Sequence, residues 1–142
     1  SKDKLILMTM DNILRKLGKR AFDLVSEIKS PIEKLEKYLF VVNQAVGPKF
    51  YRFMKDIEKI DGSKKMADFH ENFISEYTEK LLNDAIDMRE IRQIDTKAFS
   101  ILFSSIGREF LSEKNRKLIS TTPDESANSL TSIIINGIKL KN

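Results

Sequence analysis

The sequence has no cysteine and no tryptophan, and only five glycines, three prolines and one histidine among 142 residues. Without cysteine there is no disulfide framework and no thiolate to bind a metal or act as a nucleophile. Glycine and proline are too scarce for the many turns of a β-sandwich or β-barrel. No apolar run has the length of a membrane span, and no secretory signal opens the chain, so we expect a cytoplasmic protein with no membrane partner.

The chain length fits one domain, residues 1–142, with one core. Capping boxes at Ser30-Pro31-Ile32-Glu33 and Thr122-Pro123-Asp124-Glu125 mark two helix starts. Gly62 is expected to end a helix and Ser63 to cap the next. Apolar residues between such signals recur every three or four positions. The sequence therefore predicts an all-α bundle of six helices, over 2–28, 31–46, 48–60, 63–91, 95–112 and 123–140.

Positive charge is concentrated in the first part of the chain. Residues 1–60 hold 13 Lys and Arg against 8 Asp and Glu, whereas residues 61–142 hold 12 against 13. A balance of +5 suits a position near nucleic acid or an anionic surface. Many helical proteins carry such a balance and bind neither, so solvated helix faces are the alternative interpretation.

Residues for catalysis are hard to find. His70 is the one histidine, and the carboxylate bundles that hold two metal ions need two Glu-x-x-His motifs. Phosphate-binding glycine loops and the Gly-x-Ser-x-Gly motif are also absent. We therefore predict no catalytic residue, no metal site and no cofactor. His70 is expected to be a structural residue, with contact to a ligand as the alternative.

Nine phenylalanines and five methionines favour an apolar cavity for a small molecule. Such pockets have mostly apolar walls and few polar groups, and methionine adapts to irregular ligands. The alternative is that the same side chains form a plain close-packed core. The candidate ligand-binding residues are Met10, Leu14, Phe40, Gln44, Phe50, Phe53, Met54, Met66, Phe69, His70, Phe73, Tyr77, Phe99 and Phe103.

The last two predicted helices carry more apolar surface than one core can cover. A self-association face explains this excess, and Gly137 would permit close helix approach. The alternative is that both helices are central in a larger bundle. The candidate dimer-interface residues are Leu102, Ser105, Ile106, Glu109, Leu130, Ile133, Ile134, Gly137 and Ile138.

Three segments resemble the TetR family of transcriptional regulators. Ser1-Lys2-Asp3-Lys4-Leu5 resembles the segment that follows the family's helix-turn-helix and opens its long fourth helix. The stretch from Met88 to Asp95 is similar to a Gly-x-Leu/Ile-Arg-x-Asp loop before the family's eighth helix, with Met88 or Arg89 in place of the glycine. Residues 134–138 resemble the family's aliphatic ending. Helix number and order also resemble the family's C-terminal body.

The resemblance implies a ligand-sensing and dimerisation domain rather than an enzyme. The last two helices would form a four-helix interface in a homodimer, and a small apolar or amphipathic effector would bind in the body. Operator DNA would be contacted only through a helix-turn-helix domain that is not in this chain. A free-standing dimeric interaction module and a small bundle enzyme that uses His70 remain the alternatives.

Overall fold

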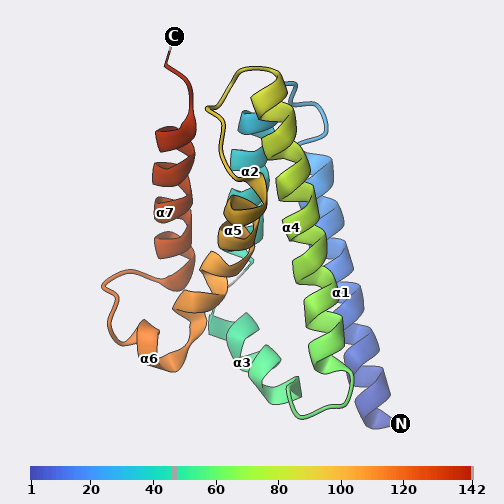
Figure 1. Ribbon diagram of the computed structural model, residues 1–142. Coiled ribbons are helices and arrows are strands. Elements are labelled where there is room, and N and C mark those ends of the chain that lie inside the picture. The colour runs from blue at the N-terminus through green and yellow to red at the C-terminus, as the bar shows by residue number, and fades with distance from the viewer. Residues whose placement is uncertain (46–47, 142) are drawn as a thin grey trace.

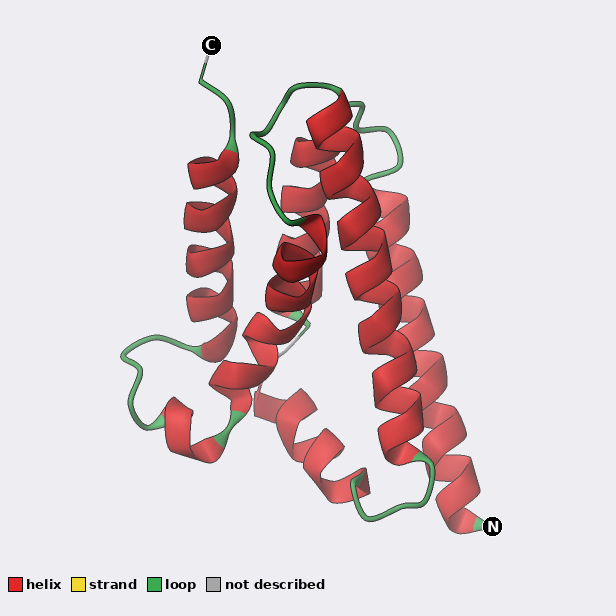
Figure 2. Cartoon of the chain, in the orientation of Figure 1, coloured by secondary structure: helices red, strands yellow, loops and turns green. Residues whose placement is uncertain are grey.

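The computed structural model describes residues 1–45 and 48–141, and the chain is all-helical over these residues. The cartoon of these residues consists of helices joined by loops (Figure 2). One isolated antiparallel bridge joins Ile91 to Lys139. The helices are α1 (Lys2–Leu24), α2 (Pro31–Gln44), α3 (Pro48–Ile57), α4 (Ser63–Asp87), α5 (Thr96–Leu111), α6 (Glu113–Arg116) and α7 (Pro123–Ile138).

The five long helices alternate in direction, and α3 and α6 lie at the end of the bundle where the chain begins (Figure 1). Helix α2 packs against α1, α4 and α7, so it has a central position. Helix α5 packs against α4 and α7, and α1 also contacts α4. The buried side chains of α2, α4 and α7 meet in one cluster that includes Leu35, Tyr38, Leu82 and Ile135.

The six predicted helices are present, and a seventh, α6, lies between the last two. It begins where the Ser112 hydroxyl accepts a hydrogen bond from Asn115 N–H at 3.2 Å. Several predicted helices were too long. Helix α1 ends at Leu24 rather than at residue 28, because tight turns around the buried Val25 replace helical hydrogen bonds. The predicted end of the second helix at Val46 lies outside the described residues.

Three predicted helix starts have the expected side-chain hydrogen bonds. Ser30 accepts from Glu33 N–H at 3.3 Å, and Thr122 N–H donates to the Glu125 carboxylate at 3.3 Å. At the start of the helix predicted over 95–112, Asp95 accepts from Ala98 N–H at 3.0 Å. The prediction for Ser63 was wrong. Gly62 precedes α4 in the left-handed conformation, and Ser63 is the first helical residue.

The segment between α4 and α5 joins distant parts of the fold. Both oxygens of Glu90 accept hydrogen bonds at the start of α2, one from the Ser30 hydroxyl and one from Ile32 N–H at 3.0 Å. The Glu90 carbonyl accepts from Leu140 N–H at 2.9 Å, just after α7. One residue therefore connects the end of α4, the start of α2 and the end of α7.

Replacing Arg89 by glycine is expected to stabilise the protein by about 1 kcal/mol. Arg89 has a φ of 58°, a left-handed conformation that costs a residue with a Cβ roughly 1–2 kcal/mol. Glycine removes that cost. It also raises the conformational entropy of the unfolded chain, and this offsets part of the gain in stability. Urea denaturation at fixed protein concentration measures the gain. Arg89→Ala is the control, because alanine keeps the Cβ and should give no gain; equal stability of both variants would contradict the prediction.

Candidate functional site: a cavity between the first, second and fourth helices

A cavity of about 480 Å³ lies between α1, α2 and α4, with one residue from α3. This volume is within the range of pockets that enclose small organic ligands. Apolar side chains make up most of its wall. The lining residues are Leu14, Leu17, Gly18, Arg20, Leu24, Lys37, Tyr38, Phe40, Val41, Val42, Gln44, Ala45, Phe50, His70, Phe73 and Ile74.

Gly18 leaves part of the α1 wall without a side chain. A Cβ placed on Gly18 would meet no atom within 4 Å, so the missing side chain corresponds to open space. Leu14 and Leu17 lie one turn and one residue before it on the same helix and also line the cavity. The glycine therefore widens the cavity without interrupting the helix.

Tyr38 supplies the most deeply buried polar group of the wall. Its side chain is fully buried, and its hydroxyl has no hydrogen-bond partner among the described residues. Its ring packs edge-on against Tyr77 with centroids 4.8 Å apart. Burial raises the pKa of Tyr38 far above its ordinary value, so the phenol stays protonated and can donate a hydrogen bond.

His70 links the cavity to α1. It lines the cavity from α4, and its Nε2 lies 2.8 Å from an Asp11 carboxylate oxygen on α1. The other oxygen of Asp11 accepts from Arg15 Nε at 2.7 Å. Both hydrogen bonds lower the pKa of Asp11, and the bond from Arg15 has the larger effect. The Arg15 guanidinium also lies over the Phe69 ring, 5.5 Å from its centroid.

Some of the predicted ligand-binding residues do line this cavity, and others lie elsewhere. The six that line it are Leu14, Phe40, Gln44, Phe50, His70 and Phe73. Met10 and Phe103 are buried in the core, and Phe99 packs against the core cluster. Met54 and Met66 are half-buried, whereas Phe53 and Phe69 are exposed.

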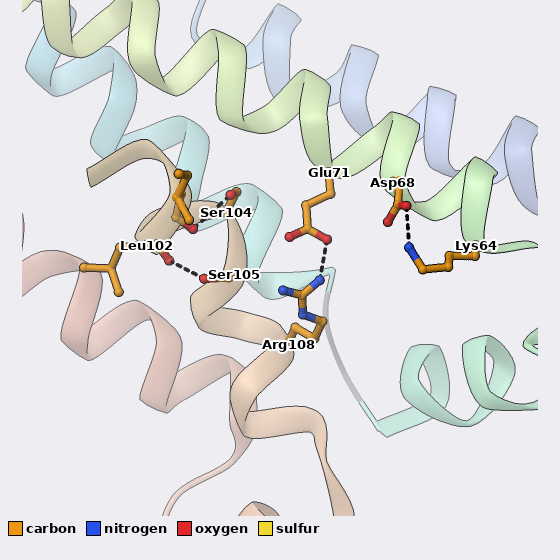
Figure 3. Close-up of polar contacts among 8 residues, drawn as sticks. Lys64, Asp68, Glu71, Leu102, Ser104, Ser105 and Arg108 are labelled. Carbon is orange, nitrogen blue, oxygen red and sulfur yellow. Dashed lines mark hydrogen bonds and ion pairs between the residues drawn. The ribbon is translucent and has the colours of Figure 1, made fainter. Parts of the chain in front are cut away.

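The cavity also differs in position from the predicted one. The predicted ligand-binding residues came from the first five helices, but no residue of α5 lines the cavity. Helix α5 instead packs closely on α4, and two ion pairs join the helices. Arg108 pairs with Glu71 at 2.6 Å (Figure 3), and Lys97 pairs with Glu79 at 3.2 Å. Leu14 is the predicted α1 residue that lines the cavity, whereas Leu17, Gly18, Arg20 and Leu24 line it without having been predicted.

A second, wider groove of about 710 Å³ lies between the end of α1, the start of α2 and α4. Phe73 and Tyr77, both predicted ligand-binding residues, line it. Its rim holds charges of both signs, and Lys80 and Asp84 form an ion pair at 2.9 Å. This groove is more open than the first and has more charged side chains in its lining, so the first cavity is the candidate site.

The predicted dimer residues divide between inner and outer helix faces. Ile106 and Ile138 are buried in the chain's own core, and Ile134 packs against it. Leu102, Leu130 and Ile133 are exposed; Glu109 and Gly137 are exposed as well, and Ser105 is half-buried.

The Ser105 hydroxyl does not leave an unpaired polar group on this face. It donates to the carbonyl of Leu102 at 3.2 Å, and Ser104 donates to that of Ile101 at 3.1 Å, within the same helix (Figure 3). Ile101 is also exposed, although it was not among the predicted interface residues. The outer faces of α5 and α7 therefore present a largely apolar surface.

Comparisons of the chain with protein-family models, curated proteins and solved structures found no match. Among the described residues, no helix is long and apolar enough to cross a membrane. The same residues contain no cluster of three or more His, Asp or Glu side chains that could hold a metal ion.

Proposed function

We propose that this chain is the effector-binding and dimerisation domain of a TetR-like transcriptional regulator. The observation that carries the proposal is the cavity, because α1 forms one of its walls and begins at the end of the chain where a DNA-binding domain would be attached. In this proposal a small amphipathic molecule occupies the cavity and changes the position of α1. The chain itself is not an enzyme.

The coupling would run through α1. Five residues of α1 line the cavity, and Asp11, close to them in the same helix, is held to α4 by His70. A ligand in the cavity could contact His70 or widen the spacing between α1 and α4. It would move the start of α1 only if it binds more tightly to one position of α1 than to the other. In a dimer, that shift changes the distance between the two recognition helices. This distance must be about 34 Å, or a multiple of it, for both helices to enter major grooves of the same DNA.

The local conformation at Arg89 supports the family resemblance. Its positive φ is the backbone conformation that glycine favours, and Arg89 is one of two residues that stand where the family pattern has glycine. The exposed Leu5 and Met8 near the start of α1 give an attached domain an apolar surface to cover.

The alternatives differ in what they require. A free-standing interaction module needs no enclosed cavity, whereas a regulator needs a helix-turn-helix encoded directly before Ser1. An in-frame helix-turn-helix there would favour the regulator, and a start codon at or near Ser1 would favour the module. A bundle enzyme would have to use His70, whose ring is engaged by Asp11.

Replacing Gly18 by leucine tests whether the cavity binds a ligand. Leucine would fill the cavity from α1, so the affinity for a neutral apolar fluorophore, N-phenyl-1-naphthylamine, should fall at least about tenfold. The same change should stabilise the protein by about 1 kcal/mol, because glycine is unfavourable inside a helix. Fluorescence titration and urea denaturation measure the two effects.

Gly18→Ala is the matched control. It should give most of the helix stabilisation while leaving room for the fluorophore, since a single Cβ at this position meets no neighbour. Unchanged binding in Gly18→Leu, or no binding to the original protein, would contradict the proposed function.

A further inference from the structure

The charged groups of the cavity are of one sign. Arg20 and Lys37 line it, and no aspartate or glutamate does. Its other polar lining groups are Tyr38, Gln44 and His70. The second groove, by contrast, mixes three lysines with three acids. The lining therefore carries two positive charges, both on exposed side chains, which favours an anion over a cation.

The two cations lie toward the same end of the cavity. Helices α1 and α2 run in opposite directions and are joined by a short segment (Figure 1). Arg20 is four residues before the end of α1 and Lys37 is six residues after the start of α2. At 1.5 Å per residue, they are about 6 Å and about 9 Å from the ends joined by this segment. The apolar Leu24 lines the cavity at that end as well, and Leu14 and Phe50 line it farther away.

Neither cation is neutralised within the described chain. Arg20 and Lys37 form no ion pair with a described residue, and Lys37 instead lies 6.0 Å from the centroid of the Phe40 ring. Tyr38, adjacent to Lys37, adds a buried hydroxyl without a partner. That hydroxyl has no accessible surface, so the charged groups open to a ligand are the exposed Arg20 and Lys37.

We propose that the effector is an amphipathic monoanion, with a carboxylate head group and an apolar tail. This inference rests on the proposed function and specifies its ligand. The carboxylate lies between Arg20 and Lys37, while the tail extends along Leu14, Leu17 and Phe73. Arginine suits this role because its planar fork matches the two oxygens of a carboxylate.

Three ligands with the same ten-carbon tail test the head group. Decanoate, decanol and decyltrimethylammonium are titrated against the protein with bound N-phenyl-1-naphthylamine, a neutral fluorophore. Decanoate should displace the fluorophore at about tenfold lower concentration than decanol, and the cation should be the weakest competitor. Added salt should weaken the binding of decanoate and leave the binding of decanol unchanged, because salt screens interactions between charges.

Variants of the cationic end locate the effect. The double variant Arg20→Gln, Lys37→Gln should lose the preference for decanoate and still bind the neutral fluorophore. Lys114→Gln, Lys117→Gln is the matched control, since it removes the same charge from exposed residues distant from the cavity lining.

The outcomes separate this inference from the proposed function. If the fluorophore binds but decanoate and decanol compete equally, the anionic effector is overturned and the cavity remains. A preference for decanoate that survives the Arg20 and Lys37 substitutions would also overturn it. If the fluorophore and all three ligands fail to bind, the proposed function and this inference fail together.

Discussion

Replacing Ile133 by glutamate is expected to convert a dimer of this chain to monomers. Ile133 is 64% exposed on the outer face of α7, the most exposed of the predicted apolar interface residues. In a two-fold symmetric interface the substitution occurs on both subunits, so two carboxylates would be buried without partners. We expect the dissociation constant to rise by about a thousandfold or more, roughly 4 kcal/mol. Analytical ultracentrifugation over a range of concentrations measures this change.

The same substitution should leave the fold of each subunit intact. Ile133 points away from the core, whereas Ala127, Thr131, Ile135 and Ile138 on the opposite face of α7 are buried. The circular dichroism spectrum of Ile133→Glu should therefore match that of the original protein. A loss of helix content would mean that the residue supports the subunit rather than an interface.

Two further variants identify the face. Leu118→Glu introduces the same charge at an exposed leucine between α6 and α7 and should leave the dimer intact. Gly137→Leu adds bulk where the subunit has open space, so it should be harmless in a monomer and disruptive in a close helix contact. A monomeric original protein, or a dimer that survives Ile133→Glu, would contradict the proposed interface.

The positions of the helices could be predicted because their signals are local. Asp95 and the segment 122–125 cap their helices through hydrogen bonds between residues three apart in the sequence, and the structure has these bonds. The predicted helix ends were less accurate because they depend on contacts between distant segments. Helix α4 stops at Asp87, and the following segment pairs with residues after α7 through Ile91 and Glu90.

The cavity could be predicted only in part, for a different reason. Periodicity identifies which helix face is apolar, but it does not show which neighbour covers that face. Phe73 and Phe103 both lie on the apolar face of a predicted helix. In the structure Phe73 lines the cavity, whereas Phe103 is buried in the core. The cations Arg20 and Lys37 had no pattern in the sequence that separated them from solvated surface charge.

Replacing Glu90 by alanine is expected to lower the free energy of unfolding by about 2–3 kcal/mol. The carboxylate accepts hydrogen bonds from the Ser30 hydroxyl and Ile32 N–H, and it lies at the positive end of the α2 dipole. Hydrogen bonds to a charged, partly buried group contribute more than ordinary ones, and their loss also leaves the donors unpaired. Because α2 is central to the bundle, the loss should appear in global unfolding by urea.

Two other variants separate the possible causes of that loss. Glu90→Gln keeps the shape and one acceptor oxygen, so it should lose about half as much as Glu90→Ala. Glu33→Ala removes an exposed acid from the first turn of the same helix and should cost about 0.5 kcal/mol. All variants must be compared at one protein concentration, because dimerisation would add to the apparent stability. If Glu90→Ala costs no more than Glu33→Ala, Glu90 does not join the three helix ends, and α2 is held by core packing alone.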